Sequence, residues 1–185
     1  MRSRLLILVL LLAAVSRGVA QSPADGKVTD NSYVNPYFQF SYIWPKFLKP
    51  YDTKALNLPQ SSPYANEFLL FSARQGDEPF GVVIFAEKLN VRTAHNAGIR
   101  DGTDFLDRAT RALSPSGHPK ILSRTHFKNA DELTFEELDY IIDGEYTSGI
   151  VIQVGQFLIV FKCNAKSAVD LAEMTKSAVA LRLAH

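Results

Sequence analysis

Residues 149–164, GIVIQVGQFLIVFKCN, constrain the fold more than any other part of the chain. β-branched and aromatic residues fill this stretch, and such residues favour strands. In an extended segment over residues 157–163, apolar side chains occupy both faces, with Phe157, Ile159 and Phe161 on one and Leu158 and Val160 on the other. A strand with two apolar faces needs cover on both sides. The stretch therefore predicts an inner strand of a layered α/β domain.

Gly155 divides this stretch into two strands. Residues 150–154 are also rich in β-branched side chains. Glycine adopts the positive φ that a tight hairpin turn requires. We therefore expect the two strands to pair antiparallel.

A helix is predicted directly after the hairpin. The Ser167 hydroxyl can cap a free backbone amide, and Asp170 stands where a capping box has its acidic residue. One apolar stripe follows at helical spacing, and we expect it to cover a face of the hairpin. The stripe consists of Leu171, Met174, Ala178 and Leu181. The alternative is that Met174 and its neighbours line a ligand site.

Residues 1–20 have the pattern of a cleaved export signal. Arg2 and Arg4 precede an uncharged run over residues 5–15, and residues 18–20, Gly-Val-Ala, supply the small side chains that a signal peptidase reads. The run is shorter than the roughly 20 residues that span a bilayer as a helix. The sequence predicts a periplasmic or extracellular protein without a membrane span after cleavage; a retained anchor is the alternative.

Composition limits the partners of the mature chain. The 185 residues are 46% apolar and 21% charged, which is typical of one globular domain with a core. Without residues 1–20, 17 Lys and Arg stand against 19 Asp and Glu, a formal net charge of −2. Since nucleic-acid binding depends on clustered basic side chains, a nucleic-acid partner is not expected. Cys163 is the only cysteine, so no intrachain disulfide forms; we expect a buried, inert thiol rather than a reactive or intermolecular one.

The mature chain is predicted to have a flexible leader, residues 21–32, and one domain, residues 33–183. The domain opens with a strand over residues 33–44 that Pro45 stops. Its alternating aromatic side chains favour packing over a stacking platform for bases or sugars. The aromatic row consists of Phe38, Phe40, Tyr42 and Trp44.

The middle of the chain alternates strands and one helix. Residues 47–66 carry three prolines and predict a long loop, a position where a binding feature can lie. Apolar runs and turn residues predict a hairpin and then a helix that residues 114–117 end, followed by three strands. The hairpin strands are residues 68–72 and 81–87, the helix is residues 105–113, and the later strands are residues 121–127, 133–142 and 146–154.

No residue pattern identifies a catalytic, cofactor-binding or metal site. The histidines lack compact ligand spacing, and neither Ser72 nor Ser123 is paired in sequence with a base. The acidic segment over residues 131–139 lacks the glycine and spacing of an EF-hand, so a solvated face is preferred over a calcium site. Its acids are Asp131, Glu132, Glu136, Glu137 and Asp139, and the histidines are His95, His118, His126 and His185.

The order of these elements resembles that of secreted bacterial members of the PsbP-like family, which share an α/β/α sandwich with Mog-type Ran-binding factors. The resemblance runs from Tyr33 to Leu183 and rests on two patterns. The patterns are Tyr33-x-Asn35-x-Tyr37-Phe38-x-Phe40-x-Tyr42-x-x-Pro45 and Gln156-Phe-Leu-Ile-Val-Phe161-x-x-x-Ala165, with the helix that Ser167 caps. Gln39 and Phe47 stand where similar chains have glycine, so the turn after the first strand is expected to differ.

The resemblance implies a single-domain α/β/α sandwich with a mainly antiparallel central sheet. Plant and cyanobacterial members assist the manganese-calcium cluster of photosystem II as non-catalytic extrinsic subunits, and Mog-type members bind a small GTPase. No residue of this chain matches a functional motif of either group, and a fold alone does not fix a function. We therefore expect a non-catalytic exported domain that binds or assembles with a protein, without a cofactor. The alternatives are a carrier of a small apolar ligand and a hydrolase or metal-dependent enzyme.

Overall fold

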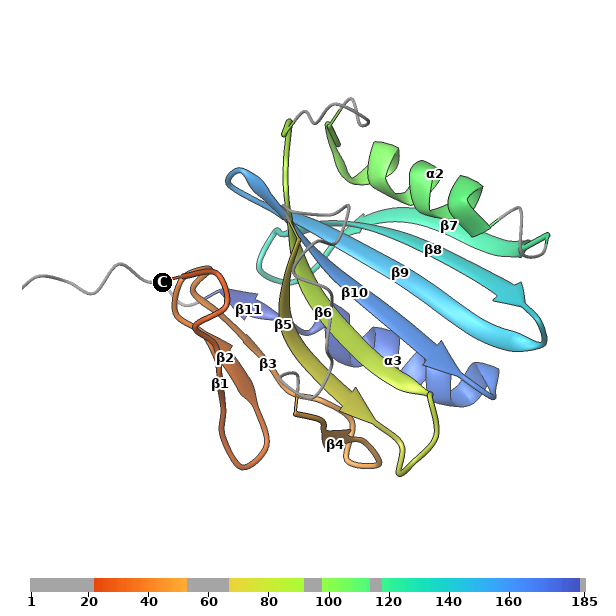
Figure 1. Cartoon of the computed structure of the whole chain (residues 1–185), viewed down its shortest axis with the longest axis horizontal. Helices are drawn as coiled ribbons and strands as arrows, with labels where there is room; N and C mark the ends of the chain where they lie inside the picture. Colours follow the sequence, from red (N-terminus) through yellow and green to blue (C-terminus); the bar gives the residue numbers. More distant parts are fainter. Residues whose placement is uncertain (1–21, 53–66, 92–97, 114–117, 184–185) are drawn as a thin grey trace, which may run out of the picture.

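A seven-stranded antiparallel sheet forms the centre of the molecule (Figure 1). The computed structural model describes residues 22–52, 67–91, 98–113 and 118–183. The strand order is β4-β5-β6-β10-β9-β8-β7, so neighbours in the sheet are mostly neighbours in sequence. The strands are β4 (Lys49–Pro50), β5 (Glu67–Arg74), β6 (Gly81–Lys88), β7 (Lys120–Lys128), β8 (Thr134–Ile142), β9 (Glu145–Val154) and β10 (Phe157–Ala165).

The hairpin of β9 and β10 lies inside this sheet, as predicted. Gly155 has a φ of 58° in the turn, and Phe161 is the cross-strand partner of Ile150. Side chains from the two faces of β10 belong to two separate apolar clusters. Ile159 and Phe161 belong to one, while Leu158 and Val160 belong to the other. The prediction of a strand covered on both sides is confirmed.

Two helices cover opposite faces of the sheet. Helix α2 (Gly102–Leu113) lies over β8 and β9, and helix α3 (Ala168–Val179) packs on β9 and β10 (Figure 1). The Ser167 hydroxyl accepts a hydrogen bond from the Asp170 amide at 3.1 Å, which confirms the predicted cap. Helix α3 ends at Val179, so Leu181 packs from the segment after the helix. The α/β/α architecture is the predicted one.

The prediction of one continuous strand over residues 33–44 is wrong. The segment forms two short strands of a second, four-stranded sheet, because the chain reverses between them. The Asn35 side chain accepts a hydrogen bond from the Phe38 amide at 3.1 Å, and Gln39 has a φ of 54°. The sheet order is β1 (Lys27–Val28), β2 (Tyr33–Asn35), β3 (Phe40–Tyr42) and β11 (Arg182–Leu183). Strand β1 lies within residues 21–32, where a flexible leader was expected, and pairs with β2.

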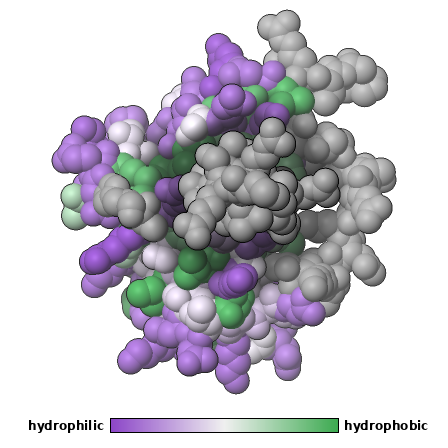
Figure 2. All heavy atoms as spheres, turned by 90° about the vertical axis from the view of Figure 1, so that its left-hand side faces the viewer, coloured by the Kyte–Doolittle hydropathy of each residue, from purple (hydrophilic) through white to green (hydrophobic). Residues whose placement is uncertain are grey.

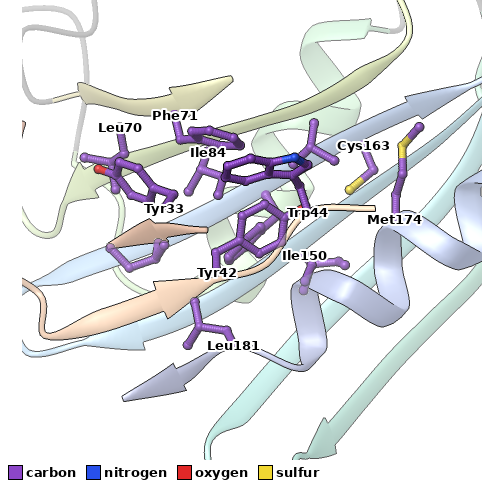
Figure 3. Packing of buried hydrophobic residues seen from close by; sticks show 14 of the residues in the cluster. Tyr33, Tyr42, Trp44, Leu70, Phe71, Ile84, Ile150, Cys163, Met174 and Leu181 are labelled. Atoms are coloured by element: carbon purple, nitrogen blue, oxygen red, sulfur yellow. The ribbon is translucent and has the colours of Figure 1, made fainter. Parts of the chain in front are cut away.

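The larger core lies between the seven-stranded sheet and the layer formed by α3 and the four-stranded sheet. Figure 3 shows rings from both sheets meeting there, with Cys163 of β10 and Met174 of α3 at one end. The Trp44 and Phe71 rings stack with centroids 5.1 Å apart, and the Tyr42 ring meets Phe161 edge-on at 5.4 Å. This packing fixes the position of the small sheet.

Several predicted features lie outside the described residues. They are the export signal, His95, His185, the helix end over residues 114–117, and most of the loop over residues 47–66. The described start of that loop contains β4, a two-residue edge strand that ends in Pro50. In the part of the chain that the structure describes, no helix has the length and apolar character needed to cross a membrane.

Candidate functional site

The two edges of the seven-stranded sheet differ in length and protection. At one edge, β4 has two residues and includes a proline, which cannot donate a backbone hydrogen bond. At the other edge, β7 has nine residues and pairs only with β8 among the described strands. All residues of β7 except Ser123 and Phe127 are exposed. A long exposed edge strand is a template for pairing with another chain.

Two exposed apolar side chains lie near the start of β7. Ile121 and Leu122 are each 46% exposed, although isoleucine and leucine are among the residues most often buried. The register with β8 shifts between Ile121 and Ser123, which makes Leu122 the bulged residue. The remainder of β7, from Ser123 onward, pairs regularly with β8.

A shallow groove of about 400 Å³ separates β7 from helix α2. The Arg124 guanidinium bridges the two elements, because it donates to the Asp107 carboxylate at 2.7 Å and to the Thr103 carbonyl at 3.4 Å. These bonds hold α2 against the edge strand. The groove is lined by Asp107, Thr110, Arg111, Ile121, Arg124 and Leu138. We call β7 together with this groove the β7 edge site.

The charge of β7 is uniformly basic. The strand carries Lys120, Arg124 and Lys128, with His126 between the last two, and it has no acidic residue. Lys128 forms an ion pair with Glu132 at 2.8 Å in the turn that follows. His118 and His126, the two described histidines, lie just before and within this strand. The edge site therefore combines an open strand edge, two exposed apolar side chains and positive charge.

The acidic segment that follows does not gather around one point. Strand alternation places Glu136 on the α2 side of the sheet, where it accepts a hydrogen bond from the Thr103 hydroxyl. Glu137 and Asp139 lie on the opposite side. Among the described residues, no group of three or more His, Cys, Asp and Glu side chains has a metal-binding arrangement.

Glu137 and Asp139 are half-buried rather than freely solvated. The Ser123 hydroxyl donates to Asp139 at 2.7 Å, and the Ser148 hydroxyl donates to Glu137 at 3.3 Å. Burial, followed by the nearby Asp139 charge, raises the pKa of Glu137. The expectation of a solvated face holds for Asp131 and Glu132 and not for this pair.

A second hollow, of about 340 Å³, lies at the start of α2. Three carboxylates line it, and each has a structural partner. Asp101 accepts a hydrogen bond from the Asp104 amide at 2.8 Å, which caps the helix. Glu132 pairs with Lys128, and Glu136 accepts from Thr103. The positions of the three acidic side chains are therefore explained by helix capping and by contacts with the strands.

The remaining candidate residues belong to the interior. Cys163 is fully buried, and burial followed by the Glu137 charge raises the pKa of its thiol, as expected for an inert cysteine. Ser72 is fully buried, and its hydroxyl has no hydrogen-bond partner in the described part of the chain. Met174 is also fully buried in the core. The aromatic row of Phe38, Phe40, Tyr42 and Trp44 is at most 5% exposed, which confirms packing as its role.

On the face shown in Figure 2, the hydrophobic side chains of the described residues form separate patches among mainly hydrophilic ones. The exposed apolar residues belong to several elements, from Val28 of β1 to Val169 of α3. Only Ile121 and Leu122 among them are neighbours in one strand. Val28 also lies on an edge strand, but β1 has two residues, whereas the β7 edge site combines two adjacent exposed apolar side chains with a nine-residue edge strand.

Sequence reasoning did not identify this site. Residues 121–127 were predicted as a strand, and that prediction is confirmed, but the sequence did not place the strand at the sheet edge. One available signal was the uniformly basic character of residues 120–128, since lysine is common on exposed edge strands.

Comparison with known proteins supports the fold. No protein-family model matches the chain, and no curated protein matches it significantly. A similar solved structure is the solution structure of cyanobacterial PsbP (CyanoP) from Synechocystis sp. PCC 6803, with a TM-score of 0.57 and 12% sequence identity. The match covers 93% of this chain and 99% of that chain. The chain has a PsbP-like fold.

Proposed function

We propose that this domain with a PsbP-like fold is exported and binds another protein without catalysing a reaction, and that the β7 edge site is its binding surface. The observation that supports this proposal most directly is the nine-residue edge strand β7. Its outer side is unpaired among the described strands and adjoins a groove of about 400 Å³. Protein partners use exposed sheet edges through backbone hydrogen bonds and use adjacent pockets for specificity.

The contrast between the two sheet edges supports this proposal. Unsatisfied edges invite unwanted pairing, and proteins commonly shorten them or place proline there. Strand β4 has both of these protections, whereas β7 is long and has no proline, and its only protections are its basic side chains and the bulge at Leu122. Exposed Ile121 and Leu122 add apolar area at the same edge, where a partner can bury it.

The alternatives receive less support from the geometry. A carrier needs space for an apolar ligand between sheet and helix, and large side chains such as Phe161 and Met174 occupy that region below α3. An enzyme needs reactive groups converging in a hollow, and the acids of the second hollow have capping and strand partners. These arrangements favour the binding role.

Affinity purification of the tagged mature chain from its own envelope extract tests the proposal. We expect one stoichiometric protein partner with the wild-type chain. The double variant Ile121→Ser/Leu122→Ser removes apolar area from the edge and should lose most of this partner, while the control Val169→Ser leaves recovery unchanged. Val169 is suited to this control because it is 77% exposed on α3, away from β7. Equal recovery by all three chains contradicts the proposed surface, and a hydrolytic activity on generic esters or phosphates contradicts the non-catalytic role.

A further inference from the structure

We infer that β7 accepts an extended, acidic segment of the partner protein as an additional strand of the sheet. This inference rests on the proposed function and specifies the chemistry of the partner. It follows from the backbone of β7, from the charges along it, and from the groove beside it.

The backbone of β7 offers a regular row of hydrogen-bonding groups. From Ser123 to Lys128, each residue has a Cα partner on β8, from Asp139 to Thr134. Alternate residues of a strand direct their N–H and C=O groups to opposite sides, so half of this segment points away from β8. The bulge at Leu122 disturbs pairing only before this segment. An incoming strand can therefore pair with residues 123–128 and contact Leu122 at its end.

The charges on β7 favour an acidic occupant over a second copy of this chain. An antiparallel pair of β7 strands centred on Arg124 brings Lys120 opposite Lys128 and Arg124 opposite itself. Like charges directly opposite each other destabilise a strand pair, whereas opposite charges stabilise it. Because β7 has basic residues and no acid, no register of a second copy places an acidic residue of β7 opposite a basic one. An acidic segment avoids this repulsion.

The groove between β7 and α2 gives the segment a second point of recognition. Its lining includes the apolar side chains of Ile121 and Leu138 together with the basic side chains of Arg111 and Arg124. The Arg124 guanidinium already contacts Asp107, so a carboxylate from the partner would share it, and Arg111 would supply a second donor. We expect the segment to direct one apolar and one acidic side chain toward this groove.

Nuclear magnetic resonance with the ¹⁵N-labelled mature chain tests the inference, because it detects weak binding residue by residue. The probe is a peptide as long as β7 with alternating valine and glutamate, and the control probe replaces glutamate by lysine. We expect the acidic peptide to shift the amide resonances of residues 120–128 and of α2, and the effect to weaken as ionic strength rises. The lysine peptide should leave these resonances unchanged.

A charge-reversal variant makes the test specific. Lys120→Glu/Lys128→Glu should weaken binding of the acidic peptide by about tenfold, since rim charges mainly set electrostatic complementarity. The control Lys27→Glu/Lys176→Glu makes the same change in net charge on β1 and α3, where both residues are exposed, and should bind as the wild type does. Equal binding of both peptides, or no shifts in β7, overturns the inference.

The outcomes separate this inference from the proposed function. The Ile121→Ser/Leu122→Ser variant can lose the partner in affinity purification while the acidic peptide leaves the amide resonances of β7 unchanged. That result supports β7 as the binding surface and contradicts the acidic segment as its occupant. Concentration-dependent shifts of β7 without any peptide identify a second copy as the occupant and also overturn the inference.

Discussion

Glu67 and Glu87 are direct cross-strand partners on β5 and β6, and the Glu87 side chain is only 7% exposed. Both lie on the face of the sheet that carries Phe85, whose ring contacts Phe105 of α2. Burial, followed by the Glu67 charge, raises the pKa of Glu87 to about 7. Burial also raises the pKa of Glu67, although the Lys162 charge opposes that shift. The sheet therefore holds two acidic groups against each other, and both resist ionisation.

This pair predicts a fall in stability between about pH 4.5 and pH 7. In that range Glu87 stays protonated in the folded chain, while the unfolded chain releases the proton near its ordinary pKa of 4.5. The folded state then binds more protons, so the free energy of unfolding decreases as pH rises through this window. The loss is up to about 3 kcal/mol, since one pKa unit corresponds to about 1.4 kcal/mol. Urea titrations of the protein at several pH values measure it.

The variant Glu87→Gln keeps the side-chain shape without the charge. It should flatten the pH dependence and stabilise the chain above pH 7, whereas the exposed control Glu173→Gln on α3 should leave the profile unchanged. Because the pKa of Glu137 is also raised, Glu137 lowers stability in the same direction as pH increases. The free energy of unfolding of Glu87→Gln should therefore still decrease with pH, with a smaller slope. A profile of Glu87→Gln that matches the wild type contradicts this account.

Asn129 is predicted to fix the end of α3 to the β7–β8 turn. Its side-chain amide donates to the carbonyls of Val179 and Leu181, both at 3.2 Å, and its oxygen accepts from the Leu133 amide at 3.0 Å. Asn129→Ala removes these bonds and should cost about 1–3 kcal/mol in the free energy of unfolding. Denaturant titration measures the cost, with the exposed Asn31→Ala as control.

Asn129→Asp tests the donor role by itself. The carboxylate keeps the acceptor for the turn but faces carbonyl oxygens at the helix end, where negative charge is unfavourable. We expect a loss of stability that diminishes when the introduced carboxylate is protonated at low pH. A variant as stable as the wild type at neutral pH shows that the two carbonyl contacts contribute nothing.

Sequence periodicity predicted the elements of the large sheet because each is a local pattern. The alternation in β10 and the helical stripe of Leu171, Met174 and Ala178 reflect burial of one or both faces. The same alternation continued through residues 33–44 and concealed a turn, since Phe38 is buried within the turn itself. The turn depends on the Asn35 side chain and on the unusual φ of Gln39, which the alternation does not encode.

The candidate site was not predictable in the same way. Its edge position depends on which strands pair, and strand order is determined by non-local contacts. Its groove depends on the bridge from Arg124 to Asp107, which are 17 residues apart. The carboxylate pair of Glu67 and Glu87 likewise requires the register of β5 with β6, including the irregularity between Leu69 and Phe71.

Phe161 should be among the most sensitive core positions. Its side chain is fully buried, and its ring lies 5.4 Å from that of Tyr42 between the two sheets. Phe161→Ala is expected to cost about 3–5 kcal/mol because it leaves a cavity. Val169→Ala, at a position 77% exposed, should change stability by no more than about 0.5 kcal/mol. A cost for Phe161→Ala below about 1 kcal/mol in a denaturant titration contradicts the packing of the two sheets.

The mature chain is predicted to begin at Gln21. The charged start, the short uncharged run over residues 5–15 and the small residues 18–20 lead to this expectation. Intact-mass analysis of the exported product should give the mass of residues 21–185. Recovery of a species that retains residues 1–20 in the membrane fraction shows an anchor instead.

The most direct test of the central claim is photo-crosslinking from the β7 edge site in the cells that produce the protein. A photoreactive amino acid at position 122 lies on the exposed edge, and the same amino acid at position 169 lies on α3. We expect position 122 to yield one crosslinked protein, attached through an acidic segment, and position 169 to yield none. Crosslinking of that protein from position 169 and not from position 122, or no crosslinked protein from position 122, would contradict binding at β7.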